Sequence, residues 1–410
     1  MALVVQNQLS VRRILLCGGL IVTLSVGIRH GFGLWLLPIS QAHGWDREVF
    51  SFAMAVQNLV WGLVGIFAGM LADRFGAFKI MVGGALCYAL GLFGMAYATT
   101  PLLFILTAGV IAGIAQAATT YIIVFGIIGR HISASKRSWA MGVAAATGSF
   151  GQFMMLPVSN SLISINGWQG ALVILACLSL LIIPLAAFLR ERVVWTPTAT
   201  DAERDQSIMA ALKEALSYRS YVLLIAGYFV CGFQVVFIAV HLPGYLKDIG
   251  LGPEVASFSL ALIGLFNIFG SYLVGVLGQR FQKRYLLMGI YSLRLVIICL
   301  FLLAPLSSLS VYLFSMTLGF IWLSTVPPTN ALIALIFGVR HLSMLGGLAF
   351  FSHQVGSFLG VWLGGMFYDR FGNYDLMWLL AIALSVLATL ANWPIKERAI
   401  DRRQKAVLTA

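Results

Sequence analysis

The chain has 410 residues, of which 60% are hydrophobic and only 10% are charged. Soluble globular proteins carry about a quarter charged residues, so this composition excludes an ordinary soluble domain and predicts a chain embedded largely in lipid. The net charge of +12 does not indicate nucleic-acid binding, because the basic residues form short clusters between long apolar segments.

Twelve segments are apolar enough to cross a bilayer, which requires about 20 residues per helix. The first is too long for a secretory signal peptide and has no small-residue cleavage site. We therefore predict an all-α membrane protein with twelve transmembrane helices. In chain order they span roughly residues 14–38, 49–72, 79–98, 101–128, 138–164, 170–189, 219–244, 255–279, 284–304, 308–338, 341–368 and 374–394.

The distribution of positive charge predicts the orientation. Of the 26 Lys and Arg residues, only Arg47, Lys247 and Arg370 fall in loops on the side away from both termini, and Arg29 and Arg294 fall inside helices. Cytoplasmic loops carry the excess of Lys and Arg in membrane proteins. Both termini are therefore expected in the cytoplasm. The bias also supports the count of twelve helices, because one miscounted helix would place every later loop on the wrong side of the membrane.

A polar stretch divides the chain into two predicted halves, residues 1–190 and 219–410, the second ending in a short cytoplasmic tail. The stretch, residues 191–218, is predicted to be a cytoplasmic linker with an amphipathic segment that has Ile208, Leu212 and Leu216 on one face; a solvated spacer is the alternative. The pattern S-F-x-x-A at 51–55 recurs at 257–261, and G-x-L-x-x-R-F at 69–75 recurs at 275–281. Both repeats share one offset, which indicates a duplication of six-helix units.

The loop between the second and third helices carries the most specific motif. Residues 69–79, G-M-L-A-D-R-F-G-A-F-K, resemble the signature of the major facilitator superfamily. Residues 136–151 are similar to the helix-5 motif of its monocarboxylate transporter branch, with Thr147 in place of a usual glycine. Residues 44–47 and 364–374 fit the bacterial members of that branch.

This resemblance implies two pseudo-symmetric six-helix halves that transport a solute by alternating access, with a central site between them. It further implies a monomeric carrier in a bacterial inner membrane that moves a small organic anion, a monocarboxylate, either with or without a proton. Many carriers of this branch have an arginine in helix 8, where this chain has Asn267 and Ser271 instead.

Two arginines lie near the centres of predicted helices, Arg29 in the first and Arg294 in the ninth. The 14 Asp and Glu residues all fall in loops, at helix ends or in the linker. An isolated arginine at the bilayer centre costs at least about 2.5–3.5 kcal/mol, so each needs water, carbonyl groups or an anion. An anionic solute would be a suitable partner for these substrate-binding candidates. The alternative is that either arginine bonds to backbone carbonyls beside a broken helix.

His30 and His353 are the mid-membrane groups that ordinarily titrate near neutral pH, so they are candidates both for proton coupling and for substrate binding. The alternative for each is a hydrogen-bonded packing histidine. Tyr121 and Asn267 are further candidates for hydrogen bonds to the solute, or else satisfied polar core residues.

Asp73 and Arg74, in the signature loop, are predicted to form a conformational latch. The carboxylate of Asp73 would interact with the positive amino end of helix 11 while the cytoplasmic side is closed.

Glycines four residues apart, such as Gly356, Gly360 and Gly364, predict close helix packing. Pro327 and Pro328 predict a kink in helix 10.

Other functions remain as alternatives. An exporter of drug-like or amphiphilic compounds would use the same fold, but helix 5 lacks the Gly-Pro motif of drug–proton antiporters. A membrane enzyme or receptor has less support, because metal-binding and phosphate-binding motifs are missing. The five cysteines have no paired spacing. We therefore expect neither enzyme activity nor a cofactor, metal site or nucleic-acid partner.

Overall fold

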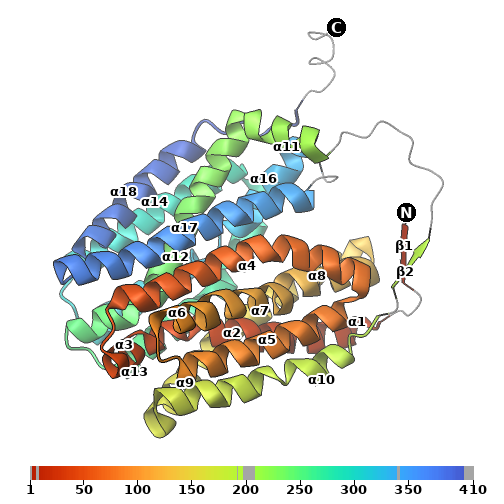
Figure 1. Ribbon diagram of the computed structural model, residues 1–410. Coiled ribbons are helices and arrows are strands. Elements are labelled where there is room, and N and C mark those ends of the chain that lie inside the picture. The colour runs from red at the N-terminus through yellow and green to blue at the C-terminus, as the bar shows by residue number, and fades with distance from the viewer. Residues whose placement is uncertain (1, 6–8, 192, 197–207, 339–341, 401–410) are drawn as a thin grey trace.

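The computed structural model describes residues 2–5, 9–191, 193–196, 208–338 and 342–400, and in this part of the chain it is almost entirely helical (Figure 1). One small sheet joins the amino-terminal strand β1 (Ala2–Val5) to β2 (Val193–Thr196) in antiparallel register.

The first half contains six membrane passes. The first pass is broken into short pieces, the fourth contains a wide helical turn, and the fifth and sixth are one assigned helix with a reversal at Gly167, where φ is +68°. In order the elements are α1 (Val11–Arg13), η1 (Ile14–Gly18), α2 (Gly19–His30), η2 (Phe32–Trp35), α3 (Leu36–His43), α4 (Arg47–Phe75), α5 (Ala77–Tyr97), α6 (Pro101–Phe104), η3 (Ile105–Ile111), α7 (Ala112–Thr119), α8 (Tyr121–His131), α9 (Ala134–Ser179) and α10 (Ile182–Ala187).

The second half also contains six passes, and helix α11 (Ile208–Ser217) precedes them. Five passes are continuous helices: α12 (Arg219–Asp248), α13 (Pro253–Arg280), α14 (Lys283–Leu303), α17 (Leu342–Phe371) and α18 (Asp375–Asn392). The remaining pass, between α14 and α17, is divided into α15 (Ser308–Phe320) and α16 (Val326–Phe337).

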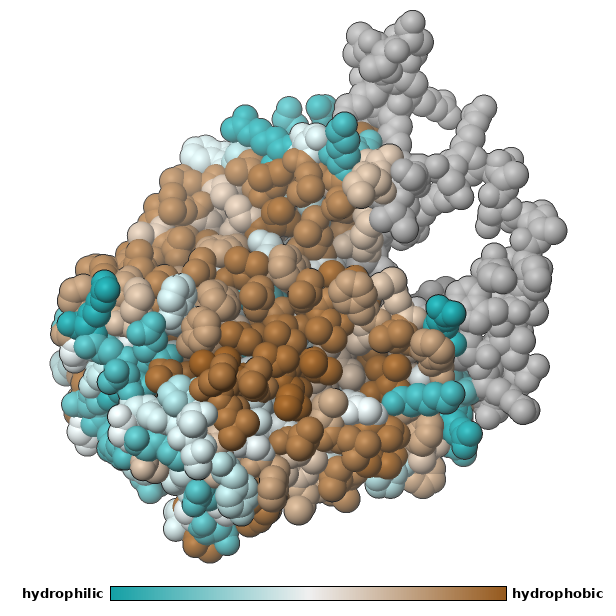
Figure 2. All heavy atoms as spheres, viewed as in Figure 1, coloured by the Kyte–Doolittle hydropathy of each residue, from teal (hydrophilic) through white to brown (hydrophobic). Residues whose placement is uncertain are grey.

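These elements confirm the predicted twelve-helix fold. Ten apolar helices in the described residues are long enough to span a membrane. One of the ten reverses at Gly167 and makes two passes, and the shorter α15 and α16 together make another. Figure 2 shows a broad apolar surface between hydrophilic residues at the two ends of the molecule, as a bilayer requires.

The segment predicted to be amphipathic forms helix α11, in which Leu212 of the predicted face is half-buried. Ala211 and Ala215 are buried, whereas Met209 and Leu216 are exposed.

The two halves lie beside each other (Figure 1), and they meet where α4 packs along α17 and α9 packs along α13. We call the side of the membrane where α1 begins and α18 ends the termini face, and the other side the opposite face. Among the described residues, the hydrogen bonds that join the halves lie at mid-depth, as between Asn58 and Gln354, or near the opposite face, as between Arg47 and Asp248. The described interface is therefore closed toward the opposite face.

Candidate functional site

Arg29 lies at mid-depth, at the end of α2, where the first pass is interrupted. The chain continues through Gly31 and Gly33 into a tight helical turn. A methyl group added at Gly33 would lie 2.3 Å from the carbonyl oxygen of Ala239 on α12. Glycine at this position therefore lets the two halves approach each other directly beside Arg29.

The guanidinium of Arg29 is only partly satisfied. Its Nη2 donates a hydrogen bond to Oδ1 of Asn58 on α4, and its Cζ lies 4.6 Å from the ring centre of Trp61. Its Nε is buried without a hydrogen-bond partner in the described structure. Its electrostatic neighbours are the phenols Tyr88 and Tyr121. The charge is therefore held by an amide, an aromatic face and neutral phenols, an arrangement that leaves it available to an anion.

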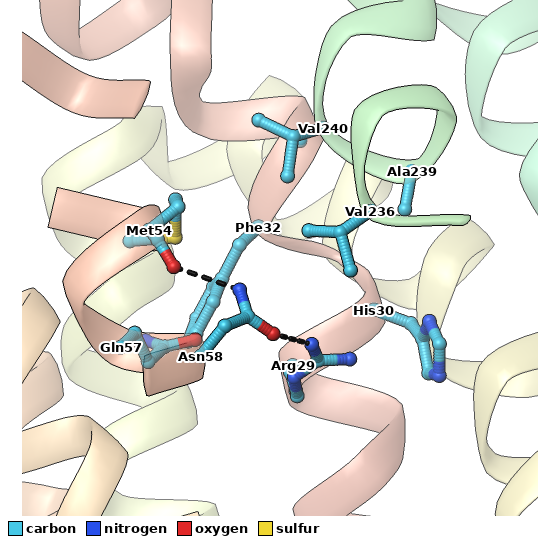
Figure 3. Close-up of a pocket in the computed structure, with 10 residues that line it drawn as sticks. Arg29, His30, Phe32, Met54, Gln57, Asn58, Val236, Ala239 and Val240 are labelled. Carbon is cyan, nitrogen blue, oxygen red and sulfur yellow. Dashed lines mark hydrogen bonds between the residues drawn. The ribbon is translucent and has the colours of Figure 1, made fainter. Parts of the chain in front are cut away.

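A narrow pocket lies beside this guanidinium, between α2, η2, α4 and α12 (Figure 3). Its lining combines one cation with amide and apolar side chains. The lining residues are Arg29, His30, Phe32, Gly33, Met54, Gln57, Asn58, Val236, Ala239 and Val240. This composition suits a solute with one anionic group and an apolar body.

The two candidate histidines occupy different surroundings. His30 lines the pocket and is half-buried, and Figure 3 shows its ring directed away from Asn58. His353 lies on α17 and is 6% exposed. Its Nδ1 lies 3.1 Å from Oε1 of Gln354, and its Nε2 is buried without a partner in the described structure.

Arg294 does not line the pocket but supports the broken tenth pass. Its side chain is 1% exposed and donates to Oε1 of Gln234 at 3.1 Å. Its Nη2 also donates to the carbonyl oxygens of Ile321 and Trp322, at 2.8 and 3.0 Å. These carbonyls lie where α15 ends, ahead of the prolines that begin α16. The geometry therefore favours the carbonyl-capping alternative for this arginine.

Asn267 supports the same break from α13. Its Oδ1 accepts a hydrogen bond from the backbone N–H of Leu323, and its Nδ2 donates to Ser149 on α9. Because both ends of the amide are occupied within the protein, Asn267 is not free to bind a solute in this state.

Tyr121 begins α8 directly after the break at Thr120 and is half-buried. Its hydroxyl is close enough to α9 that a methyl group at Gly148 would meet it at 1.8 Å. Tyr121 lies in the same half as Arg29 and is one of its electrostatic neighbours, whereas Asn267 and Arg294 belong to the helix break.

The latch prediction was not tested, because the Asp73 side chain lies outside the described residues. Arg74 is exposed, with its Cζ 5.3 Å from the ring centre of Phe75. No group of three or more potential metal ligands occurs among the described residues.

Sequence reasoning missed Asn58, Trp61 and Gln354. Asn58 and Gln354 are polar residues in the middle of apolar helices, and this position alone could have marked them as candidates. Their alignment across the two halves depends on how α4 packs against α17, and this packing cannot be read from either segment alone.

A family model described as Major Facilitator Superfamily matches residues 15–361. The chain is 26% identical over 392 residues to the Uncharacterized MFS-type transporter YcxA of Bacillus subtilis (strain 168), covering 90% of this chain and 92% of that protein. It is 26% identical over 376 residues to Monocarboxylate transporter 13 of Rattus norvegicus, covering 90% of this chain and 86% of that protein.

Solved structures show the same fold at lower sequence identity. A bacterial homologue of the human lysosomal transporter Spinster, in an inward-facing and unoccupied conformation, superposes with a TM-score of 0.74 at 16% identity, covering 93% of this chain and 92% of that chain. A D-xylose-proton symporter superposes with a TM-score of 0.68 at 16% identity, covering 94% of this chain and 97% of that chain.

Proposed function

The chain belongs to the major facilitator superfamily and is a membrane transporter, and from that premise we propose that its solute is a small organic anion, specifically a monocarboxylate. The solute crosses by alternating access of the two halves. Coupling to a proton is part of this proposal.

The observation that carries the proposal is the incomplete pairing of Arg29. The guanidinium lies between the two halves, and its hydrogen bond goes to the neutral amide of Asn58. No ion pair involves it among the described residues, and no carboxylate lines its pocket. A buried cation without an anion is costly, so a carboxylate solute would provide the missing charge through two parallel hydrogen bonds.

The pocket walls support a monocarboxylate over a sugar or a dicarboxylate. Phe32, Met54, Val236 and Val240 are apolar and offer nothing to a second carboxylate or to a row of hydroxyl groups. The amides of Gln57 and Asn58 are already hydrogen-bonded within the protein, which leaves His30 as the polar wall residue beside Arg29. The relatives named as monocarboxylate transporters agree with this assignment.

The positive charge on the termini face supports a cytoplasmic location for both ends in a bacterial inner membrane. On this assignment the structure opens inward, since its described interface is closed toward the opposite face. We also propose residues 1–190 and 219–410 as the two halves and residues 191–218 as the linker.

Uptake by reconstituted vesicles tests the proposal, with radiolabelled acetate, lactate, pyruvate and benzoate as probes and glucose as the neutral comparison. Arg29→Gln should lower uptake of the transported carboxylate at least tenfold without lowering the melting temperature. Arg29→Lys should recover part of the rate, because a point charge cannot reproduce the two-pronged contact. Lys247→Gln, which removes an exposed cation far from the pocket, is the matched control and should behave as the wild type.

Near-normal carboxylate uptake by Arg29→Gln would overturn the site. Transport of glucose, with no uptake of any of the four carboxylates, would overturn the solute class.

A further inference from the structure

Three hydrogen bonds, joined through the residues Asn58 and Gln354, connect Arg29 in the first half with His353 in the second. Arg29 donates to the side chain of Asn58. Gln354 on α17 donates from Nε2 to the backbone oxygen of Asn58 at 3.0 Å, and its Oε1 lies 3.1 Å from Nδ1 of His353. The bond between Gln354 and Asn58 crosses the interface, so it exists only while α4 and α17 are packed as they are here.

These hydrogen bonds determine which ring nitrogen of the neutral His353 imidazole carries the hydrogen. A backbone carbonyl can only accept, so the NH2 group of Gln354 must face Asn58, and its oxygen must then face Nδ1 of His353. The hydroxyl of Ser357 donates to the carbonyl oxygen of His353 at 2.9 Å, so toward Nδ1, 3.5 Å away, it also acts as an acceptor. Nδ1 therefore carries the hydrogen, and the lone pair is on Nε2.

The Nε2 nitrogen lies among aromatic side chains. Nε2 is buried without a partner in the described structure. The ring of Phe350 is stacked at 6.0 Å and that of Tyr228 lies at 4.9 Å. A proton on Nε2 would create a buried charge, which is unfavourable unless a neighbouring group balances it. The thiol of Cys231 on α12 interacts with the His353 side chain and is the neighbour that could do so.

The other titratable groups near His353 come from neighbouring helices. Helix α12 contributes Tyr228 and Cys231, and Cys231 is also an electrostatic neighbour of Arg294 on α14. Helix α4 contributes the neutral Asn58, which leads to the cation Arg29. No carboxylate appears among these neighbours, and the acidic group that could balance a protonated His353 is the thiol of Cys231, which interacts with its side chain.

We infer that His353 carries the cotransported proton. In the state closed toward the opposite face, with the bridge from Asn58 to Gln354 formed, His353 has released that proton. Gln354 is a positioning residue, because it holds the imidazole as its Nδ1–H tautomer. Separation of α4 from α17 breaks the bridge and withdraws Trp61 of α4 from Phe350, whose ring is stacked on the imidazole. Water then reaches Nε2 and protonates it. The inference rests on the proposed function for its meaning in transport, but its test requires no solute.

Conformation should consequently depend on pH in the empty protein. Fluorescent amino acids at the exposed loop residues Thr99 and Leu306, one in each half near the opposite face, would report the separation without disturbing the five native cysteines. Acidification from pH 8 to pH 5.5 should favour the state open at that face, by up to about tenfold per pH unit, the limit for one proton.

Three variants identify the responsible group. His353→Gln should abolish the pH dependence, whereas His43→Gln, the matched control at the end of α3 and outside the pocket, should retain it. Gln354→Glu should move the midpoint upward by about 1–3 pH units, because a carboxylate stabilises the imidazolium. A merely structural role for Gln354 would leave the midpoint unchanged and would overturn the positioning claim.

Nitrogen-15 spectra provide a second measurement on the unmodified protein. His353, assigned by loss of its signals in His353→Gln, should show the Nδ1–H tautomer at pH 8. An Nε2–H tautomer, or full pH dependence in His353→Gln, would overturn the inference. Either result would be independent of vesicle uptake, so it would leave the assignment of Arg29 and the carboxylate intact.

Discussion

Arg47 of the first half holds Asp248 of the second through two hydrogen bonds, from Nη1 to Oδ2 at 2.8 Å and from Nη2 to Oδ1 at 2.7 Å. The guanidinium also lies 3.5 Å from the ring centre of Tyr368 and donates to the hydroxyl of Tyr374. Asp369 completes the junction by accepting from the backbone N–H of Arg47 at the start of α4. These contacts close the interface at the opposite face.

Asp248→Asn should weaken this closure. Hydrogen bonds to charged groups contribute about 1.5–3 kcal/mol, so their partial loss should shift the population toward the state open at the opposite face by about tenfold or more. The distance between probes at Thr99 and Leu306 measures the shift. Asp375→Asn removes the same charge on the same face, at a residue with no ion pair among the described contacts, and should leave the distances unchanged. An equal response in both variants would assign the effect to net charge.

Glu191 should make the stability of the first half depend on pH. Burial of Glu191 raises its pKa, but hydrogen bonds from His131 and Arg130 more than compensate, and the pKa is lowered overall. A lowered folded-state pKa stabilises the fold above the ordinary glutamate pKa of about 4.3, and this stabilisation is lost as the pH falls through the lower folded value.

Melting temperatures between pH 7 and pH 3.5 test this linkage. Glu191→Gln should melt lower than the wild type at pH 7, because one partner of a buried pair is removed, at a cost of about 3–5 kcal/mol. The difference should narrow as the pH falls below about 4. Glu254→Gln, at an exposed carboxylate, is the control and should change little. A difference that stays constant over this pH range would contradict the assignment.

Gly356 allows α17 to lie directly on α12. A methyl group at this position would be 2.0 Å from the carbonyl oxygen of Phe229, whereas at Gly347 on the same helix it would meet nothing within 4 Å. Gly356→Ala should therefore force the helices apart and lower the melting temperature by several degrees. Gly347→Ala should be neutral or slightly stabilising, because alanine favours the helix. Similar behaviour of the two variants would argue against close packing as the role of Gly356.

Much of the fold follows from composition and periodicity, because a bilayer requires long apolar helices and its charge asymmetry orients them. The twelve passes and the disrupted tenth pass were predictable in this way. The interruption at Gly31 and Gly33 was not predicted, since it reflects the approach of Ala239 from the other half. Helix contacts of this kind depend on the assembled bundle.

The candidate site was only partly predictable for the same reason. Arg29 is conspicuous in the sequence because a charge in an apolar helix needs an explanation. In the sequence, its neighbour Asn58 and the partner Gln354 from the other half are ordinary amides. Their role becomes visible only when helix packing brings them together. Arg294 is as conspicuous as Arg29, but its partners are backbone carbonyls released by the helix break. Charge placement identifies residues that need partners, and packing decides which partners they find.

Arg294 should consequently be required for folding. Its replacement by glutamine would leave the carbonyls of Ile321 and Trp322 buried without their donor, and the Oε1 of Gln234 would lose a bond as well. Unsatisfied buried groups cost about 1–3 kcal/mol each, so Arg294→Gln should strongly reduce the yield of monodisperse protein and its melting temperature. Arg29→Gln, which also removes a mid-membrane arginine, should retain both. Arg294→Lys should be only a partial replacement, because an ammonium group cannot span Gln234 and both carbonyls in one plane. A normally folded Arg294→Gln variant that had lost carboxylate uptake would show instead that this arginine serves transport.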